Sequence, residues 1–110
     1  MPTAHQRTSN RKITGVVPSS DQQDFDCIPF DSFDGVKYII KVYNQTENRF
    51  QLVEMTGTKK DADVSDQISS RHRGPLQVSL NLVKVATDVC LRIVNSETFA
   101  VNVSILKIDF

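Results

Sequence analysis

The feature that most constrains this chain is an alternation of apolar and polar residues that runs in short segments from residue 35 to residue 110. A period of two is typical of β-strands, because successive side chains of a strand point to opposite faces of its sheet. Alanine is scarce in these segments, and valine, isoleucine and threonine are frequent, which disfavours helices. The pattern therefore predicts an all-β protein.

The clearest alternation predicts strands at residues 36–43, 49–56, 76–86, 89–94 and 99–110, with a weaker strand near residues 62–69. Polar connections at residues 45–48, 86–88 and 95–98 are short, which favours antiparallel pairing of sequential strands. We expect a small antiparallel β-sandwich, jelly-roll-like in form, at residues 35–110. An extended N-terminal arm and wrap is expected at residues 1–34.

The expected arm is basic in its first part and acidic in its second. Up to residue 20 its charged residues are Arg7, Arg11 and Lys12, whereas residues 21–34 carry five aspartates and no base. So polar a segment buries too little apolar surface to order itself. We expect a neighbouring subunit to hold it in place, with a solvated tail as the alternative.

The second part of the arm is expected to wrap around the body. Pro29 lacks the N–H that a central strand position needs, so this segment is expected at an edge. Four apolar residues stand here among the aspartates and would tie the arm to the body: Phe25, Ile28, Phe30 and Phe33.

Two of the expected strands change phase midway. In the first, the apolar series ending at Leu82 continues at Val83 on the opposite face, and in the second it passes from Ile105 to Leu106. Either a β-bulge or a second buried face explains such a change. The second explanation predicts a sheet with apolar residues on both faces, one of which contacts a neighbouring subunit.

The sequence contains no pattern that indicates catalysis or metal binding. Cys27 and Cys90 are far apart, as are His5 and His72, so no zinc-binding spacing is present. A nucleophilic triad would depend on the one histidine of the body, and the four glycines are not clustered as in a phosphate-binding loop. We expect no enzyme activity, no cofactor and no metal.

The N-terminal residues lack the apolar core of a signal peptide, and no apolar run reaches the roughly 20 residues of a membrane span. We therefore expect synthesis in a reducing cytoplasm without processing, and no membrane partner. In that compartment Cys27 and Cys90 are expected to be free thiols, with a disulfide as the lesser alternative.

Charge disfavours nucleic acid as a partner. Thirteen basic and 13 acidic residues balance, tryptophan is absent, and Tyr38 and Tyr43 are expected on opposite faces. The sharpest polar feature is the cluster Arg71, His72 and Arg73, followed by a Gly-Pro turn. It is expected either to dock against an acidic surface or to form a solvated loop tip.

From residue 36 onward the order of segments resembles a β-sandwich module of tailed bacteriophages, including cyanophages, found in virion structural and fibre-related proteins. The similar segments are KYIIKVYN, RFQLVEM, the Gly-led GPLQVSLNL, VCLRIVN and the closing VNVSILKIDF. Residues 57–73 depart from the module because they lack its aromatic-rich strand, so a shorter sheet is expected there. The resemblance implies a virion component, commonly trimeric, that binds other virion proteins and has no active site.

A single module after one short arm favours a capsid decoration, or cement, protein over a long receptor-binding fibre. A tail, neck, baseplate or fibre adaptor is one alternative, and a carbohydrate-binding attachment module is another. We expect a homotrimer located in the virion, with the major capsid protein or other virion proteins as partners. The arm residues expected to bind the partner are Arg7, Arg11, Lys12, Ile13, Val16 and Val17. The residues expected at the subunit interface are Phe25, Ile28, Phe30, Phe33, Ile39, Tyr43, Val83, Val85, Leu106, Ile108 and Phe110.

Overall fold

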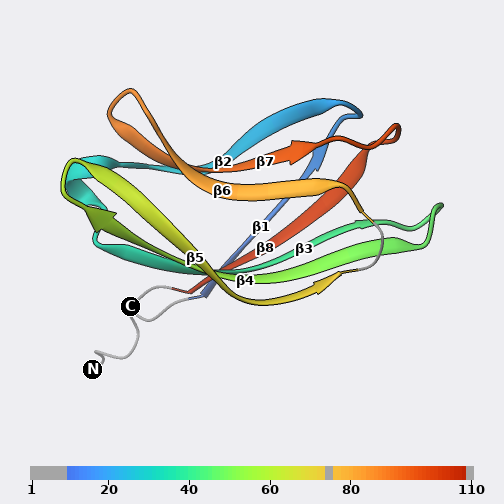
Figure 1. Ribbon diagram of the computed structural model, residues 1–110, viewed down its shortest axis with the longest axis horizontal. Helices are drawn as coiled ribbons and strands as arrows, with labels where there is room; N and C mark the ends of the chain where they lie inside the picture. The colour runs from blue at the N-terminus through green and yellow to red at the C-terminus, as the bar shows by residue number, and fades with distance from the viewer. Residues whose placement is uncertain (1–9, 74–75, 109–110) are drawn as a thin grey trace.

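The computed structural model describes residues 10–73 and 76–108 of the chain (Figure 1). These residues form β-strands and one short 3-10 helix, Phe30–Ser32, and include no helix that could cross a membrane. The strands are β1 (Asn10–Val17), β2 (Asp21–Pro29), β3 (Gly35–Asn44), β4 (Arg49–Lys60), β5 (Asp63–Arg73), β6 (Val78–Val85), β7 (Asp88–Asn95) and β8 (Val101–Ile108).

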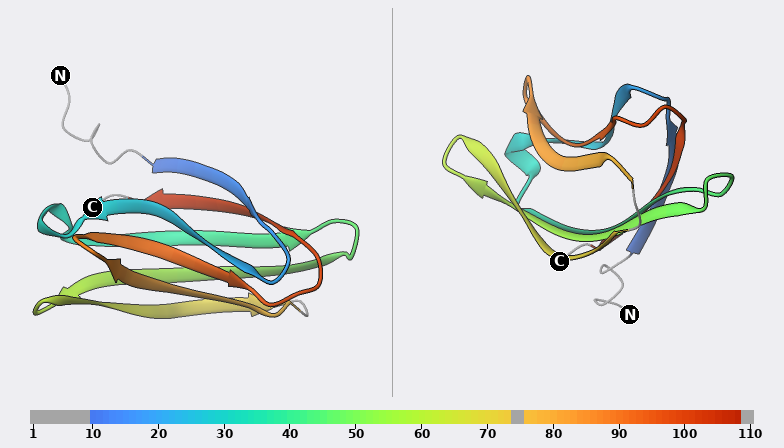
Figure 2. Two further views of the ribbon diagram at one scale, coloured as in Figure 1. Left: turned by 90° about the horizontal axis from the view of Figure 1, so that it is seen from above. Right: turned by 45° about the vertical axis from the view of Figure 1, so that its right-hand side comes forward.

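The strands form two antiparallel sheets that lie one over the other (Figure 2). The larger sheet has the order β1-β8-β3-β4-β5, and the smaller has the order β2-β7-β6. Hairpins join β3 to β4, β4 to β5 and β6 to β7. The connections at residues 45–48 and 86–88 form hairpins as expected. The connection at residues 95–98 instead passes from one sheet to the other, so the pairing expected between β7 and β8 is wrong. The expected all-β antiparallel sandwich is therefore confirmed.

Residues 10–29 belong to the sandwich, although we expected them in an extended arm. Strand β1 pairs with β8 from Asn10 opposite Ile108 to Val17 opposite Val101, and β2 pairs with β7 in the other sheet. Only Ile13 and Val17 supply large apolar side chains to the inward face of β1, so its alternation is weak in the sequence. Pairing with distant strands orders this polar segment, and the boundary expected at residue 34 does not separate an arm from a body.

The core lies between the two sheets. In β3 every second residue from Val36 to Val42 is buried, as the alternation predicts. The sheets approach closely at Gly57, where an added Cβ would lie 2.0 Å from Cδ1 of Leu82, so β4 has no room for a side chain there. The other buried apolar residues are Val17, Phe33, Val53, Met55, Leu76, Val78, Leu80, Leu82, Val89, Cys90, Leu91, Ile93, Val101, Val103 and Ile105.

The two phase changes are not bulges. The pairing of β6 with β7 runs without a shift through Val83, and that of β8 with β3 runs without a shift through Leu106. Apolar residues therefore do lie on second faces, but on opposite sides of the molecule. Val83 is on the outside of the smaller sheet, whereas Leu106 and Ile108 are on the outside of the larger one.

Strand β5 extends further than the weak strand that we expected. It pairs with β4 from Lys60 opposite Asp63 to Gln51 opposite Arg73, so the sheet is not shorter in this region. The backbone of Arg71, His72 and Arg73 is consequently part of β5 rather than of a loop. The side chains of this cluster lie outside the described residues.

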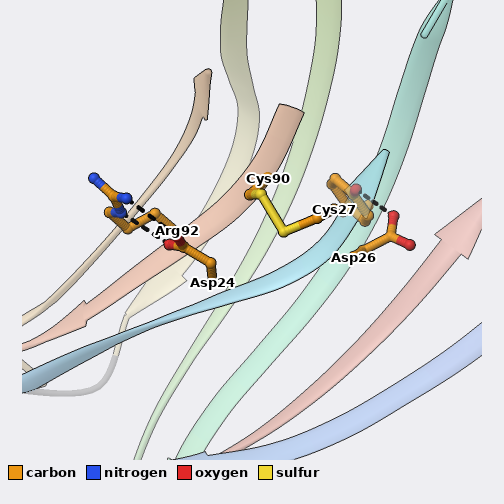
Figure 3. Close-up of a disulfide and its surroundings, with 6 residues drawn as sticks. Asp24, Asp26, Cys27, Cys90 and Arg92 are labelled. Carbon is orange, nitrogen blue, oxygen red and sulfur yellow. Dashed lines mark hydrogen bonds and ion pairs between the residues drawn. A yellow bond between two sulfur atoms is a disulfide. The ribbon is translucent and has the colours of Figure 1, made fainter. Parts of the chain in front are cut away.

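Cys27 and Cys90 form a disulfide, so the expectation of free thiols is wrong. Phe25 lies opposite Leu91 and Ile28 opposite Val89, which leaves two residues of β2, Asp26 and Cys27, facing Cys90 alone. This β-bulge brings the cysteine Cα atoms to 4.2 Å (Figure 3). The sequence did not predict this disulfide, because it placed Cys27 in an arm and gave no indication that β2 pairs with β7.

Candidate docking surface

The side of the larger sheet that faces away from the smaller sheet carries the candidate site, and we call it the outer face. Its residues follow from the register, because strand neighbours directly opposite each other lie on the same face. Tyr43 lies opposite Phe50, and Lys41 lies opposite Leu52. The described residues of the outer face include Lys12, Val16, Lys37, Ile39, Lys41, Tyr43, Phe50, Leu52, Glu54, Leu106 and Ile108.

Apolar side chains on this face remain in contact with solvent. Val16 is 54% exposed, Leu52 is 41% exposed and Phe50 is 38% exposed. They account for all but one of the large exposed apolar residues of the described chain, the other being Val85 on β6. Such residues scattered singly need no explanation, but Phe50 and Leu52 are neighbours on one face of one strand.

At the start of β4 the usual pattern is reversed: the apolar residues face solvent and the polar residue faces the core. Phe50 and Leu52 point outward, while Gln51 between them is fully buried. The amide Nε2 of Gln51 donates to the carbonyl oxygen of Val78 at 3.5 Å, and its Oε1 has no hydrogen-bond partner among the described residues. Burying an unsatisfied amide oxygen costs about 1–3 kcal/mol. The exposure of Phe50 and Leu52 is therefore accompanied by the cost of burying Gln51 in the core.

An open hollow of about 520 Å³ lies on the outer face at the hairpin between β3 and β4. This hairpin projects beyond the sandwich at the right of Figure 1. Asn44 stabilises it, because its Nδ2 donates to the carbonyl of Ala100 at 2.7 Å and its Oδ1 accepts from the N–H of Glu47 at 2.8 Å. The hollow is lined by Lys41, Tyr43, Asn44, Gln45, Asn48, Arg49, Phe50 and Leu52.

The outer face is basic as well as apolar. Nζ of Lys41 lies 4.9 Å from the centre of the Tyr43 ring. Within the described part of the chain, no carboxylate forms an ion pair with Lys41 or Lys12, whereas Lys37 lies 3.6 Å from Glu54. The hollow contains no carboxylate among its lining residues, although Nη1 of Arg49 lies 3.8 Å from Oε1 of Glu97 outside it. The surface suits an anionic partner that also has apolar groups.

The structure separates the residues expected to form one interface. Ile39, Tyr43, Leu106 and Ile108 lie on the outer face, but Val83 and Val85 lie on the other side of the sandwich. Phe33 is buried in the core. Phe25, Ile28 and Phe30 pack against the core, so these four residues support the fold and do not form a free surface.

The arm residues that we expected to bind the partner do not lie together on one surface. Val17 is fully buried and Ile13 packs against the core, while Arg11 forms an ion pair with Asp26. Lys12 and Val16 lie on the outer face. Arg7 and Phe110 lie outside the described residues.

Phe50, Leu52 and Lys41 were missing from the expected interface. The signal was present, because residues 50, 52, 53 and 55 are all apolar or thioether side chains and cannot share one face of a regular strand. The sequence alone does not say which pair turns outward. That choice is made by the register, which places Gln51 opposite the buried Val42.

Asp26 between the sheets and the pair Asp24 and Arg92 on the outside of the smaller sheet are already partnered. Asp26 accepts a hydrogen bond from the hydroxyl of Tyr38 at 2.6 Å and lies 3.0 Å from Nζ of Lys107. Arg92 donates to both carboxylate oxygens of Asp24, and this hydrogen bonding raises the pKa of Arg92 (Figure 3). Among the described residues, no group of three or more acidic, histidine or cysteine side chains is placed to hold a metal ion.

Comparison with known proteins gives no family for this chain. No protein-family model matches it, and no curated protein is similar to it.

Proposed function

We propose that this protein is a non-enzymatic structural component of a phage virion, a capsid decoration protein that binds neighbouring virion proteins through its outer face. The resemblance of residues 36–110 to a phage virion module supports the class of protein. The observation that carries the binding surface is the inverted start of β4, where Phe50 and Leu52 are exposed and Gln51 is buried. A contact that covers both side chains would compensate for this arrangement.

The energetic gain would come from removing apolar surface from water. Burying one phenylalanine or leucine side chain contributes about 1.5–3 kcal/mol, and Tyr43 and Ile39 lie beside these residues on the same face. The N-terminal clamp that we expected would be shorter than residues 1–17, because residues 10–17 pair with β8 within the same chain. Only the residues before Asn10 remain candidates for a clamp.

The disulfide is consistent with a particle component. Disulfides persist on secreted proteins and virion surfaces and are rare in reducing cytoplasm. Cys27 is exposed, so its bridge to Cys90 would be open to reduction inside a cell and stable on a released particle. The proposal therefore places synthesis in the host cytoplasm and bond formation after release.

Co-sedimentation with phage capsids that lack the protein tests this proposal. We expect the wild-type protein to bind and the double variant Phe50→Ser, Leu52→Ser to lose most binding. Val85→Ser is the matched control, because Val85 is 40% exposed but lies on the opposite side of the molecule. Equal binding by all three proteins would exclude the outer face, and absence of wild-type binding would contradict the decoration role.

Deleting residues 1–9 in the same assay separates the clamp from the outer face. The deletion leaves β1 intact, since that strand begins at Asn10. If these residues act as a clamp, the truncated protein binds more weakly while the Val85→Ser control binds normally. Micrographs that locate the protein on tails or necks would instead favour the adaptor alternative.

Carbohydrate attachment is a second candidate with one observation in its favour. Tyr43 and Phe50 lie side by side in the hollow, and the amide side chains of Gln45 and Asn48 line its rim. Aromatic rings beside amides can bind sugars. A glycan array tests this candidate: a signal that Phe50→Ser abolishes would support it, and no signal would reject it.

A further inference from the structure

We propose that the hollow at the β3–β4 hairpin binds an acidic polypeptide segment of the partner, which inserts an aromatic or aliphatic side chain against Tyr43 and Phe50. This inference rests on the proposed docking function and names the chemistry of the partner. The hollow has about 520 Å³, a size typical of sites that accept a few side chains or a small ligand.

Charge in the hollow selects an anionic segment. Lys41 and Arg49 line it and no lining residue is acidic. Because Lys41 is exposed and forms no ion pair among the described residues, a partner carboxylate would not have to displace an existing one. Its position over Tyr43 also places the ammonium beside the apolar contact, at 4.9 Å from the ring centre. An acidic residue next to an apolar one in the partner would meet both groups.

A second copy of this chain is a poorer occupant of the outer face. Stacking two copies through a twofold axis would bring the same surface of each together. The interface would then gather Lys12, Lys37 and Lys41 of both copies. Among the described residues of the strands, the outer-face acids that could compensate them are Glu54 and Asp63. Like charges placed together cost affinity, so the surface favours an acidic partner of another kind.

Each edge strand carries a feature that hinders the addition of a further strand, which favours the face as the route to a partner. Asp66 accepts a hydrogen bond from the edge N–H of Leu82 at 2.9 Å on β6, and β2 carries a bulge and Pro29. Strand β1 turns the charged Arg11 inward to Asp26, and the pairing of β5 shifts between Glu54 and Met55. Bulges, prolines and inward charges at edges all hinder the addition of a further strand.

Aliphatic side chains on the outer face favour a polypeptide over single-stranded nucleic acid. Bases stack on aromatic rings, and Tyr43 and Phe50 could serve in that way. The outer face also has aliphatic surface, from Leu52, Ile39 and Leu106, on which bases cannot stack. Apolar side chains of a protein can cover that surface. A polypeptide with acidic and apolar residues therefore uses more of this surface than an oligonucleotide does.

Fluorescence anisotropy with three labelled probes tests the proposal: a random glutamate–tyrosine copolymer, poly-glutamate and an oligo-dT strand. We expect the copolymer to bind about tenfold more tightly than poly-glutamate, a difference of about 1.4 kcal/mol, and more tightly than oligo-dT. Phe50→Ser should abolish the preference for the copolymer, and Lys41→Glu should weaken binding of both acidic polymers. Val85→Ser and Lys60→Glu are the matched apolar and charged controls, and both should bind as the wild type does.

Three results would overturn the inference: tighter binding of oligo-dT than of the copolymer, equal binding of both acidic polymers, or equal effects of Phe50→Ser and Val85→Ser. The capsid assay remains independent of these probes. If Phe50→Ser, Leu52→Ser loses capsid binding while the copolymer does not bind, the docking function stands and the acidic partner is rejected. If capsids are not bound but the copolymer is, the hollow binds acidic polypeptides and the virion proposal fails.

Discussion

The carboxylate of Asp26 connects the two sheets. Its backbone lies at φ 51° in the bulge of β2, which turns the side chain inward while the next residue, Cys27, faces outward. The side chain is 4% exposed and contacts three groups of the larger sheet, the hydroxyl of Tyr38, the ammonium of Lys107 and the guanidinium of Arg11. Lys107 is itself only 12% exposed, and this carboxylate supplies the opposite charge beside its ammonium group.

We expect Asp26→Asn to lower the free energy of unfolding by about 3 kcal/mol, because Lys107 loses its ion-pair partner in a mostly buried site. Asparagine tolerates positive φ, so backbone strain does not account for the loss. Urea denaturation measures the difference. Adding Lys107→Met should restore part of the stability by removing the unpaired charge, and a double variant that is less stable than the single one would contradict this account.

At the scale of elements, β2 and β7 are joined both by pairing and by the disulfide between Cys27 and Cys90. The bond closes a loop across 63 positions of sequence that includes most of the larger sheet. It therefore restricts the unfolded chain over a long segment, and the entropy that it removes from the unfolded state grows with loop length.

Reduction of the disulfide should lower the free energy of unfolding by about 4 kcal/mol for a loop of this length. The urea midpoint of the wild-type protein, measured with and without dithiothreitol, checks this expectation. The variant Cys27→Ala, Cys90→Ala is the control, and its midpoint should not respond to the reductant. An unchanged wild-type midpoint would mean that the bond adds no stability.

The edge of β6 is protected by a side chain of the other sheet. Asp66 on β5 accepts a hydrogen bond from the N–H of Leu82, and Nζ of Lys84 donates to the carbonyl of Ala62 at 2.9 Å. These bonds close the side of the sandwich where β5 and β6 meet without a shared ladder.

We expect Asp66→Ala to cost about 1–2 kcal/mol, since the part-buried N–H of Leu82 loses its acceptor. The exposed edge should also raise light scattering in concentrated samples. Asp66→Asn keeps an oxygen acceptor and should stay close to the wild type in both measurements. Equal losses for the alanine and asparagine variants would point to the charge of Asp66 rather than to its hydrogen bond.

For the whole molecule, the chain passes between the two sheets at β1–β2, β2–β3, β5–β6 and β7–β8, so neither sheet is a continuous segment. Side chains strengthen this linkage: Nδ2 of Asn95 on β7 donates to the carbonyls of Val17, Pro18 and Phe99 near the ends of β1 and β8. Separating the sheets would expose the shared core of both.

Unfolding should therefore be a single cooperative transition. Tyrosine fluorescence, to which the buried Tyr38 contributes, reports the core, and far-ultraviolet circular dichroism reports the strands. The two signals should give the same urea midpoint under oxidising conditions. Separate midpoints would show that one sheet persists without the other.

Alternation in the sequence is sufficient to predict the all-β class, the hairpin of β3 and β4, and the buried residues of β3, because a period of two determines which side chains share a face. It also shows that apolar residues change face in β6 and β8. It does not identify the neighbour on each side, since strand pairing depends on residues far apart in the chain. The interface residues Val83 and Leu106 were therefore grouped together although they lie on opposite sides of the sandwich.

Strands β1 and β2 illustrate the remaining gap. Few of their residues are apolar, so local composition indicates an arm, and their order comes from pairing with β8 and β7. The disulfide and the Asp26 contacts follow from that pairing. Likewise, residues 49–56 predict a strand, but only the packing of the two sheets turns Gln51 inward and leaves Phe50 and Leu52 outside. Local patterning thus establishes the strands, and long-range pairing establishes the surface that they present.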